Sequence, residues 1–515
     1  MTKNITFIDL LYPENEYVNH KLSEFSFIDE LDLYNILELN KKNFDLSQYF
    51  TKSKEVIEYR NNILSDFTEN NCLANLEEII GLIKNINEIR ESKKQASEIV
   101  GILYTVFEIE FYINLIEYLK KFLNQHNFTS AALTNLKQYL EFILSSENYI
   151  NLKENLKNFR MTVDNIKSFT IGVNLNRDLK PYEAGVVSVN STNYRSGNLF
   201  DRILSLDTKD DGYRCLAPLS PVRGDRTDNQ ALMIAFNNAL ENIIKNNLKS
   251  WQAVIKDYIV ENTNYFINMA NDLKFYCALL KYINKCRQNG FYIAKPEIIS
   301  DAENIRCKNI YNIQVALHSE ELIYNDVEFD ENGQVYILTG PNQGGKSVFL
   351  KALGINQALF QLGGYVNASQ ANLKISPNII VYLTKNDERS IGYGHLGEEC
   401  SAVSDLLKYA GKNCMVLFDE AFSSTSASDQ CYIAREVLKA LSELQCYGIF
   451  TTHNYDIYDK TKEIASMGSL VALMKNDSGE RSYKIARKAP DRNSYAMDIA
   501  KKYNLQYDDI LKGVL

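Results

Sequence analysis

The 515-residue sequence predicts a multidomain protein in which an α-helical lever or core region with a small β-rich insert is followed by an α/β domain. Three observations lead to this fold class. Apolar residues recur at helical spacing through much of the first half. Between about residues 161 and 226 that spacing changes to the alternation typical of strands. After residue 300, short continuous apolar runs are separated by amphipathic runs, which indicates buried strands joined by helices.

The helical part is predicted from periodicity and from the scarcity of glycine and proline between residues 73 and 158. Leu76, Ile79, Ile80, Ile83 and Ile86 recur on one helical face,. A second helical stretch is expected over about 229–285. The predicted segments are 1–70 (helical or mixed), 71–160 (helical lever or core), 161–226 (β-rich insert), 227–300 (helical return) and 301–515 (α/β domain).

The insert is expected to hold two extended runs. Phe169, Ile171 and Val173 alternate along the first run, and a second run carries Val186 and Val189, with residues 176–181 connecting them,. Acidic and basic residues nearly cancel within the insert. The sequence therefore leaves open whether its surface is simply solvated or binds the phosphates of a nucleic acid.

Composition limits the possible class and location of the protein. The net charge of −9 and the isoelectric point of about 5.4 exclude a chain coated with basic residues for nucleic acid, so any such surface must be local,. No apolar run approaches the roughly 18 residues of a membrane span, and the N-terminus lacks the pattern of a signal peptide. The sequence has nine cysteines and no C-x-x-C pair, which indicates that they are reduced and lie in the core,. We therefore expect a cytoplasmic protein without a membrane partner.

The strongest motif is Gly340-Pro-Asn-Gln-Gly-Gly-Lys-Ser347, which fits the phosphate-binding pattern G-x-x-x-x-G-K-[ST],. An apolar run, 335–338, precedes it as a strand should, and an amphipathic run, 348–362, follows as a helix should. Backbone N–H groups in such a loop point at phosphate oxygens. Lys346 would reach the β and γ phosphates, and Ser347 would ligate Mg²⁺. The alternative is a glycine turn that happens to carry a lysine.

Two further apolar runs end in polar residues that suit nucleotide hydrolysis. Residues 414–418 lead into Asp419 and Glu420, and residues 448–452 lead into His453. Parallel strands would bring these ends to one sheet edge. Asp419 would hold the Mg²⁺ shell, Glu420 would orient or deprotonate the attacking water, and His453 would bind a γ-phosphate or that water. Each residue alone is commonly structural, but the three together in this order favour catalysis.

These motifs resemble the ATPase of the MutS family. The segment 339–347 is similar to that family's T-G-P-N-M-G-G-K-S, Asp419–Asp429 to its D-E-[IL]-G-R-G-T-S-T-x-D, and Asn325-Asp326 to the N-D that opens its nucleotide domain. The resemblance covers about residues 305–515. It implies an α/β P-loop ABC-type ATPase domain that uses ATP and Mg²⁺. The contacts it implies for ATP are Gly340, Pro341, Asn342, Gln343, Gly344, Gly345, Lys346, Ser347 and Val348.

The sequence departs from the family pattern at several positions. Gln343 replaces a methionine, Val348 a threonine, and Phe422-Ser423-Ser424 the G-R-G after the acidic pair. The signature segment, expected near 394–399, lacks its serine. The resemblance implies a homodimer with composite ATP sites, but the residues that cross between subunits stay open. The serine-rich loop 423–426 is one candidate, and a plain loop is the alternative.

The adenine contact is the least specific assignment. The resemblance implies an aromatic or apolar residue just before the N-D pair, where Ile323 and Tyr324 stand. Tyr324 is the candidate for stacking on the base. It is equally one of 33 tyrosines available to fill a core.

The resemblance also frames the expected function. The first 70 residues are too few for the mismatch-reading and connector domains of mismatch-repair members, the formal F-x-E match near Phe107 lies in a helical run, and no room is left for an Smr tail. We expect a shortened member of the family, similar to the mismatch-repair proteins but without those domains. Its implied function is an ATP-gated dimeric clamp on DNA of branched, recombination or other non-mismatch structure. The alternative is an ATP-driven switch acting on a protein or ribonucleoprotein partner.

Overall fold

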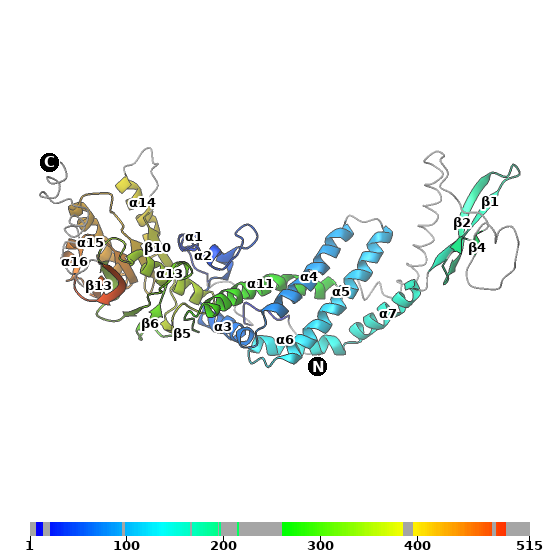
Figure 1. The fold of residues 1–515 in the computed structure, drawn as a ribbon, viewed down its shortest axis with the longest axis horizontal. Coiled ribbons are helices and arrows are strands. Elements are labelled where there is room, and N and C mark those ends of the chain that lie inside the picture. The colour runs from blue at the N-terminus through cyan, green and yellow to red at the C-terminus, as the bar shows by residue number, and fades with distance from the viewer. Residues whose placement is uncertain are drawn as a thin grey trace. The chain divides into compact units, whose positions relative to one another are not determined.

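The computed structural model describes residues 7–13, 21–94, 98–164, 167–193, 195–196, 214–215, 260–384, 395–475 and 480–490 (Figure 1). Contacts divide the chain into two compact units. Unit 1 comprises Met1–Ile8, Ala74–Phe128 and Leu133–Leu273, and unit 2 comprises Asp9–Leu73, Thr129–Ala132 and Lys274–Leu515. The architecture is mixed helical and α/β with several sheets, as the sequence predicts at this level.

Unit 1 is built mainly from long helices. They are α4 (Leu73–Lys94), α5 (Glu98–Gln125), α6 (Ala131–Ser145), α7 (Glu147–Asp164) and the first part of α11 (Val260–Gln288). The face predicted for α4 is buried at Leu76, Ile79, Ile83 and Ile86, whereas Ile80 is only partly buried. Phe107 lies in helix α5, as expected, but its ring is 37% exposed.

The predicted extended runs of the insert form an antiparallel hairpin in unit 1. Strand β1 (Ser168–Leu175) pairs with β2 (Pro181–Asn190). The Asn176 side chain accepts hydrogen bonds from the backbone N–H groups of Asp178 and Lys180, both at 2.9 Å, and so shapes the turn,. Two short strands, β3 (Arg195–Ser196) and β4 (Arg214–Cys215), pair in parallel. Most of the remaining insert and the predicted helical stretch before Val260 lie outside the described residues.

The N-terminal segment of unit 2 packs on the α/β region. It contains α1 (Phe27–Glu30), α2 (Leu33–Ile36), the 3₁₀ turn η1 (Leu46–Tyr49) and α3 (Lys54–Glu69). Thr51 and Gln361 exchange hydrogen bonds: the Thr51 N–H donates to the Gln361 carbonyl at 3.2 Å, and the Gln361 amide donates to the Thr51 carbonyl at 3.1 Å. The predicted segments 1–70 and 301–515 therefore share one compact unit over most of their described residues.

The main sheet of unit 2 has six strands in the order β10, β11, β12, β8, β13, β14. Neighbours pair in parallel except β13 with β14, which are antiparallel. The strands are β8 (Val335–Thr339), β10 (Ile379–Leu383), β11 (Met415–Asp419), β12 (Tyr447–Thr451), β13 (Met467–Lys475) and β14 (Glu480–Arg487). Central strands β8, β11 and β12 are nearly fully buried, as expected for continuous apolar runs in a parallel sheet,.

Helices and a smaller sheet complete unit 2. The helices are α12 (Ile313–Ala316), α13 (Lys346–Gln361), α14 (His395–Leu407), α15 (Ala427–Glu443) and α16 (Asp456–Thr461). The smaller sheet has the order β5 (Glu297–Ile298), β9 (Gln370–Leu373), β6 (Ile305–Ile310), β7 (Asn325–Phe329). Because β8 and β11 both pair with β12, their carboxyl ends lie at one edge of the main sheet.

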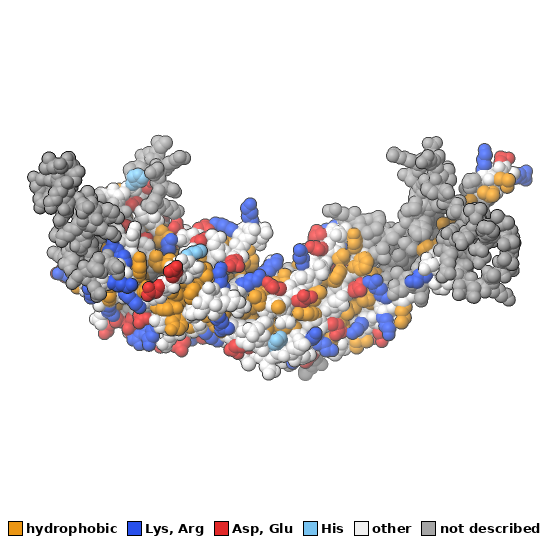
Figure 2. All heavy atoms as spheres, viewed as in Figure 1, with side chains coloured by type: hydrophobic (Ala, Val, Ile, Leu, Met, Phe, Trp, Pro, Cys, Tyr) orange, Lys and Arg blue, Asp and Glu red, His pale blue; other side chains and the backbone are white. Residues whose placement is uncertain are grey.

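The surface and the cysteines agree with the expectations from composition. On the face drawn in Figure 2, acidic and basic side chains of the described residues are interspersed, and neither sign forms a broad patch there. The eight described cysteines are free, and all but Cys400 are buried. Within the described ranges, no helix combines the length and the apolar character needed to cross a membrane.

Candidate functional site

The loop between β8 and α13, residues 340–345, is held tightly against β13 and has the glycines its backbone requires. Gly340 has a φ of +139° and Gly345 a φ of +90°, conformations that L side chains rarely adopt,. A Cβ on Gly340 would lie 2.7 Å from the Ala472 Cβ, and one on Gly344 would lie 2.9 Å from the Pro341 carbonyl oxygen. We call residues 340–347 the glycine loop.

Lys346 begins α13, and its side chain is only 4% exposed. Its Nζ donates to the carbonyl oxygens of Gly340 at 3.3 Å and Pro341 at 3.2 Å, so the chain folds back across its own loop. Burial lowers the pKa of Lys346, and the nearby carboxylates of Glu420 and Asp419 oppose that effect,. The Nζ lies 3.8 Å from a Glu420 oxygen. A buried cation with a carboxylate at this distance is well prepared to pair with an anionic ligand.

Ser347 and Asp419 meet as the motifs predict. The Ser347 hydroxyl donates to Asp419 Oδ1 at 3.0 Å, and the Thr451 hydroxyl donates to the same oxygen at 2.6 Å. A hydroxyl beside a carboxylate offers the hard oxygen ligands that Mg²⁺ prefers. Thr451 was not expected at the site from the sequence. Among the described residues, no group of three or more His, Cys, Asp or Glu side chains could hold a metal.

Glu420 and His453 are also in contact. His453 Nε2 lies 2.5 Å from Glu420 Oε1, and the Lys346 Nζ lies 3.4 Å from the same histidine nitrogen. The pKa of Glu420 is lowered, chiefly by the hydrogen bond from His453, while burial acts in the opposite direction,. Its carboxyl group is therefore ionised at neutral pH. The three residues predicted to be catalytic are thus brought together at one sheet edge.

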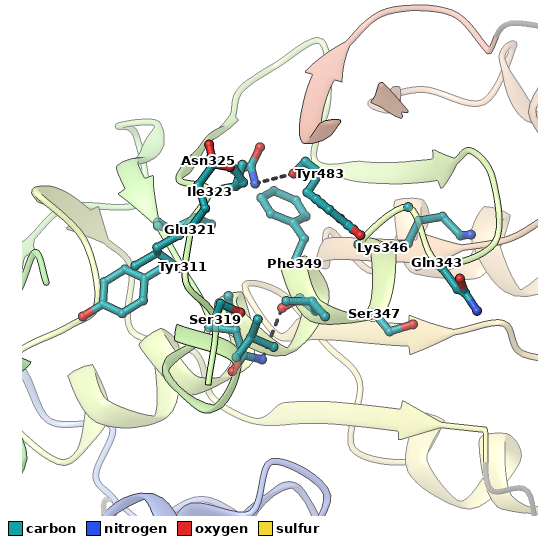
Figure 3. Close-up of a pocket in the computed structure, with 18 of the residues that line it drawn as sticks. Tyr311, Ser319, Glu321, Ile323, Asn325, Gln343, Lys346, Ser347, Phe349 and Tyr483 are labelled. Carbon is teal, nitrogen blue, oxygen red and sulfur yellow. Dashed lines mark hydrogen bonds between the residues drawn. The ribbon is translucent and has the colours of Figure 1, made fainter. Parts of the chain in front are cut away.

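A cavity of about 500 Å³ opens beside the glycine loop (Figure 3). One end is formed by the loop and Glu420. The other is formed mainly by apolar and amide side chains from β6, α12, β7, α13 and β14 and from the segment between α12 and β7. The lining residues used below are Gln343, Gly344, Gly345, Lys346, Ser347, Val348, Glu420, Ile323, Asn325, Phe349 and Tyr483. In Figure 3 the Tyr483 ring extends toward Lys346, with the Phe349 ring close to it.

Tyr483 was not expected at this site from the sequence, and Asn325 explains its position. The Asn325 amide donates to the Tyr483 carbonyl oxygen at 3.1 Å, and its Oδ1 accepts from the Ile485 N–H at 2.7 Å. These two bonds fix β14 beside β7, and the Tyr483 ring lies over Gly345. Phe349 was also missed. Its place in the first turn of the predicted helix was the one available signal, because the Phe349 N–H donates to the carbonyl oxygen of Gly345 in the loop, at 2.9 Å,.

Some predicted residues lie outside the cavity lining. Gly340, Pro341 and Asn342 shape the loop from behind, while Asp419 and His453 lie beyond Ser347 and Glu420. Tyr324 is not among the lining residues. Its ring packs 4.9 Å from Tyr292 and 5.7 Å from Tyr311, measured between centroids, whereas its neighbour Ile323 lines the cavity.

The segments expected to cross between subunits are described only in part. Residues 385–394 lie outside the described residues, and α14 begins at His395. The Ser424 hydroxyl donates to Glu399 at 2.9 Å, so the serine-rich loop contacts the last residue of the expected signature segment within the same chain. Ser426 caps α15, because its hydroxyl accepts from the Asp429 N–H at 3.2 Å,. That serine therefore has a structural role within its own chain.

The fold and the site define a class of protein that combines helical and α/β parts. In its main sheet, the glycine loop follows the carboxyl end of the central parallel strand β8. Comparison with known families extends this description. The pattern of MutS domain V matches residues 336–512, and that of the MutS2 N-terminal domain matches residues 52–289. The chain belongs to the MutS family.

Individual relatives agree with the family assignment. The chain is 30% identical over 259 residues to the DNA mismatch repair protein MutS of Prochlorococcus marinus (strain AS9601), a match that covers 48% of this chain and 28% of that protein. It is 24% identical over 304 residues to the protein of the same name from Lactobacillus johnsonii, covering 55% of this chain and 35% of that protein. The chain thus spans about a third or less of the length of these relatives.

Proposed function

We propose that the chain is a Mg²⁺-dependent ATPase of the P-loop, ABC type that works as a dimeric, ATP-gated clamp on DNA. The observation that carries the ATPase part is the convergence of Lys346, the Ser347–Asp419 pair and Glu420 around one loop. Family membership supports the same reading, since the relatives named above are DNA mismatch repair proteins.

The residues present fit a nucleotide triphosphate with Mg²⁺. The absence of side chains at Gly344 and Gly345 lets a phosphate approach the loop backbone, and the loop leads directly into the start of α13,. Lys346 would pair with the phosphates. Ser347 and Asp419 would hold Mg²⁺, which neutralises developing charge on phosphate oxygens when bound. The apolar end of the cavity, with Ile323, Phe349 and Tyr483, offers surface for the adenine base,.

Glu420 is suited to orienting the attacking water. Its lowered pKa keeps the carboxylate ionised, so it accepts a hydrogen bond from water readily but is a weak base,. His453 holds that carboxylate through the 2.5 Å contact. The buried Lys346 Nζ lies 3.8 Å from the same carboxylate, so a phosphate bound at the loop would lie close to both groups,.

The DNA part of the proposal rests mainly on family membership. The face drawn in Figure 2 mixes charges of both signs, so phosphate binding on that face would have to be local,. An ATP-driven switch that acts on a protein or ribonucleoprotein partner is therefore kept as the second candidate. The specific observation in its favour is the net charge of −9. Composite sites across a homodimer are part of the first proposal, with the 423–426 loop as a candidate for the trans contact.

The test is the steady-state ATPase rate of the wild type and of Lys346→Ala, with Lys351→Ala as the matched control. Lys351 lies on the same helix but does not line the cavity. Each protein is assayed without DNA and with duplex, single-stranded and four-way-junction DNA over a salt series. A DNA-dependent rate that is lost only in Lys346→Ala and weakens steeply with salt supports the clamp. If none of the DNA forms changes the ATPase rate, the second candidate, a switch on a protein or ribonucleoprotein partner, is favoured. If the wild type has no ATPase activity at all, the proposed ATPase function is overturned.

A further inference from the structure

The loop between β11 and α15 contains two non-glycine residues in the left-handed region of backbone conformation. Glu420 has a φ of +51° and Phe422 a φ of +60°, with Ala421 between them. Residues with a Cβ are strained there and persist only where the surroundings hold them. The strain is adjacent to the carboxylate proposed to orient water. Whatever holds this loop therefore decides where the Glu420 side chain points.

The ring of Phe422 is the main anchor. It is 1% exposed and belongs to an apolar cluster formed by strands β8, β10, β11 and β12 and helices α14, α15 and α16. Members of this cluster include Phe418, Phe450, Cys431, Ala434 and Ile457. Burying an aromatic ring is strongly favourable and offsets the strained backbone. A glycine at this position would adopt the same φ without strain, but it would have no ring to keep the loop in place.

Backbone contacts fix the loop on either side of Glu420. The Glu420 N–H donates to the carbonyl oxygen of Thr451 at 3.2 Å and to its hydroxyl at 3.0 Å. The Ala421 carbonyl oxygen accepts from the Gln430 amide at 3.2 Å. The Glu420 side chain itself is 32% exposed, and its closest contact is the His453 ring. The backbone therefore brings the Glu420 side chain within reach of His453, and Phe422 secures that backbone on the C-terminal side.

We propose that Phe422 is a positioning residue whose buried ring holds the Glu420 carboxylate beside His453 and Lys346. Phe422 does not line either of the two cavities that include Glu420, so it would act only through that residue. The inference rests on the proposed role of Glu420 in hydrolysis. It adds that a phenylalanine, at the place where the resembled loop carries a glycine, fixes the catalytic geometry through the hydrophobic core.

The first test needs no catalytic activity. Crystal structures of the full chain are compared for the wild type and Phe422→Gly. We expect the 2.5 Å contact between Glu420 and His453 in the wild type and its loss in the variant. If the variant keeps the contact, or if the wild type lacks it, the proposal is overturned. This outcome does not depend on whether the chain hydrolyses ATP, so the two proposals can fail separately.

The second test separates positioning from stability. Phe422→Gly should lower kcat by about tenfold to a hundredfold, the scale of a misplaced catalytic group, and leave the affinity for a non-hydrolysable ATP analogue within about threefold. Phe422→Leu should recover most of the rate. Leu438→Ala is the matched control, because Leu438 is fully buried in the same cluster but lies on α15 away from the loop. Leu438→Ala should lower the Tm. At temperatures below its unfolding transition, its kcat should equal that of the wild type.

A double variant tests whether Phe422 acts through Glu420. In a Glu420→Gln background, Phe422→Gly should cause no further loss of kcat, while its effect on the Tm should persist. A further loss of the same size in that background would overturn the proposal. So would an equal loss of kcat in Leu438→Ala. If the wild type binds ATP but does not hydrolyse it, the proposed ATPase function is refuted. The comparison of the crystal structures then decides the proposal for Phe422.

Discussion

The two ends of the cavity in Figure 3 are assembled in different ways. The polar end consists of one continuous stretch, 343–348, with Glu420 added from the end of β11. The apolar end combines Ile323 ahead of β7, Phe349 on α13 and Tyr483 on β14. A short motif encodes the backbone geometry of the first end directly. The second end exists only because tertiary packing brings three distant segments together, so no local pattern describes it.

The largest effect is expected at the polar end, for Glu420→Gln. The amide keeps the size of the side chain but removes the charge that orients water, so kcat should fall by about a hundredfold to a thousandfold. Binding of ATP should be retained. Glu436→Gln is the control, because Glu436 pairs with its neighbour Arg435 on α15 and lies outside this cavity. Turnover and filter-binding measurements on both variants check the prediction, and an unchanged turnover in Glu420→Gln would show that another group orients the water.

The success of sequence reasoning follows the same division. The buried parallel strands, the glycine loop and the convergence of Lys346, Ser347, Asp419 and Glu420 were predictable, because parallel strands must end at one sheet edge,. Thr451 was missed, although it ends β12 next to Asp419 in register. Its hydroxyl is invisible to motif matching because threonine is equally common in ordinary strands. The hairpin of unit 1 was predictable from alternation.

Tertiary packing overrode sequence proximity at the apolar end. Tyr324 was expected to meet the base because it precedes the Asn325-Asp326 pair. Both residues precede β7, and of the two only Ile323 lines the cavity. The Tyr324 ring packs instead with Tyr292 and Tyr311. Tyr483 follows a segment with no apolar motif of its own, and its approach to the loop depends on the Asn325 bridge.

Thr451→Val should have the next largest effect. Valine matches the shape of threonine but loses the hydroxyl that donates to Asp419 at 2.6 Å and accepts from the Glu420 N–H at 3.0 Å. Orienting partners of metal-ligating carboxylates are worth about tenfold or more in metal affinity, so the Mg²⁺ concentration for half-maximal ATPase should rise by about tenfold. Ser469→Ala, a buried hydroxyl on β13, is the control. An unchanged Mg²⁺ requirement would contradict a metal role for Asp419.

Tyr483→Ala and Tyr324→Ala compare the observed and the expected aromatic residue at the apolar end. Loss of an aromatic contact with the base should weaken ATP binding by about threefold to tenfold in Tyr483→Ala. Inhibition by inorganic tripolyphosphate, which has no base, should stay unchanged. Tyr324→Ala should alter stability rather than affinity, because its ring packs on Tyr292 and Tyr311. Isothermal titration measures the affinity of each variant for ATP and for tripolyphosphate. Equal weakening of ATP binding by the two substitutions would show that Tyr483 contacts the base no more than Tyr324 does.

The smallest effect at neutral pH should come from the link between the two catalytic side chains. The hydrogen bond from His453 lowers the pKa of Glu420 below its ordinary value of 4.5. A carboxylate with a lowered folded-state pKa contributes its stabilisation above the unfolded pKa and loses it as the pH falls through the folded one. The same lowered pKa keeps Glu420 ionised to lower pH. Because the ionised carboxylate is the form that orients water, the acidic limb of the kcat profile should lie below pH 4.5 in the wild type,.

His453→Gln should move that limb to higher pH. The neutral amide stabilises the carboxylate less than the ring does, while the burial that raises the pKa of Glu420 remains,. Any loss of rate on the neutral plateau reports on contacts that His453 itself makes, whereas the position of the limb reports on Glu420. Profiles of kcat against pH, with circular dichroism to confirm folding at each point, separate the two. A limb that stays in place would mean that the carboxylate ionises independently of His453 and that the 2.5 Å contact does not tune the polar end of the cavity.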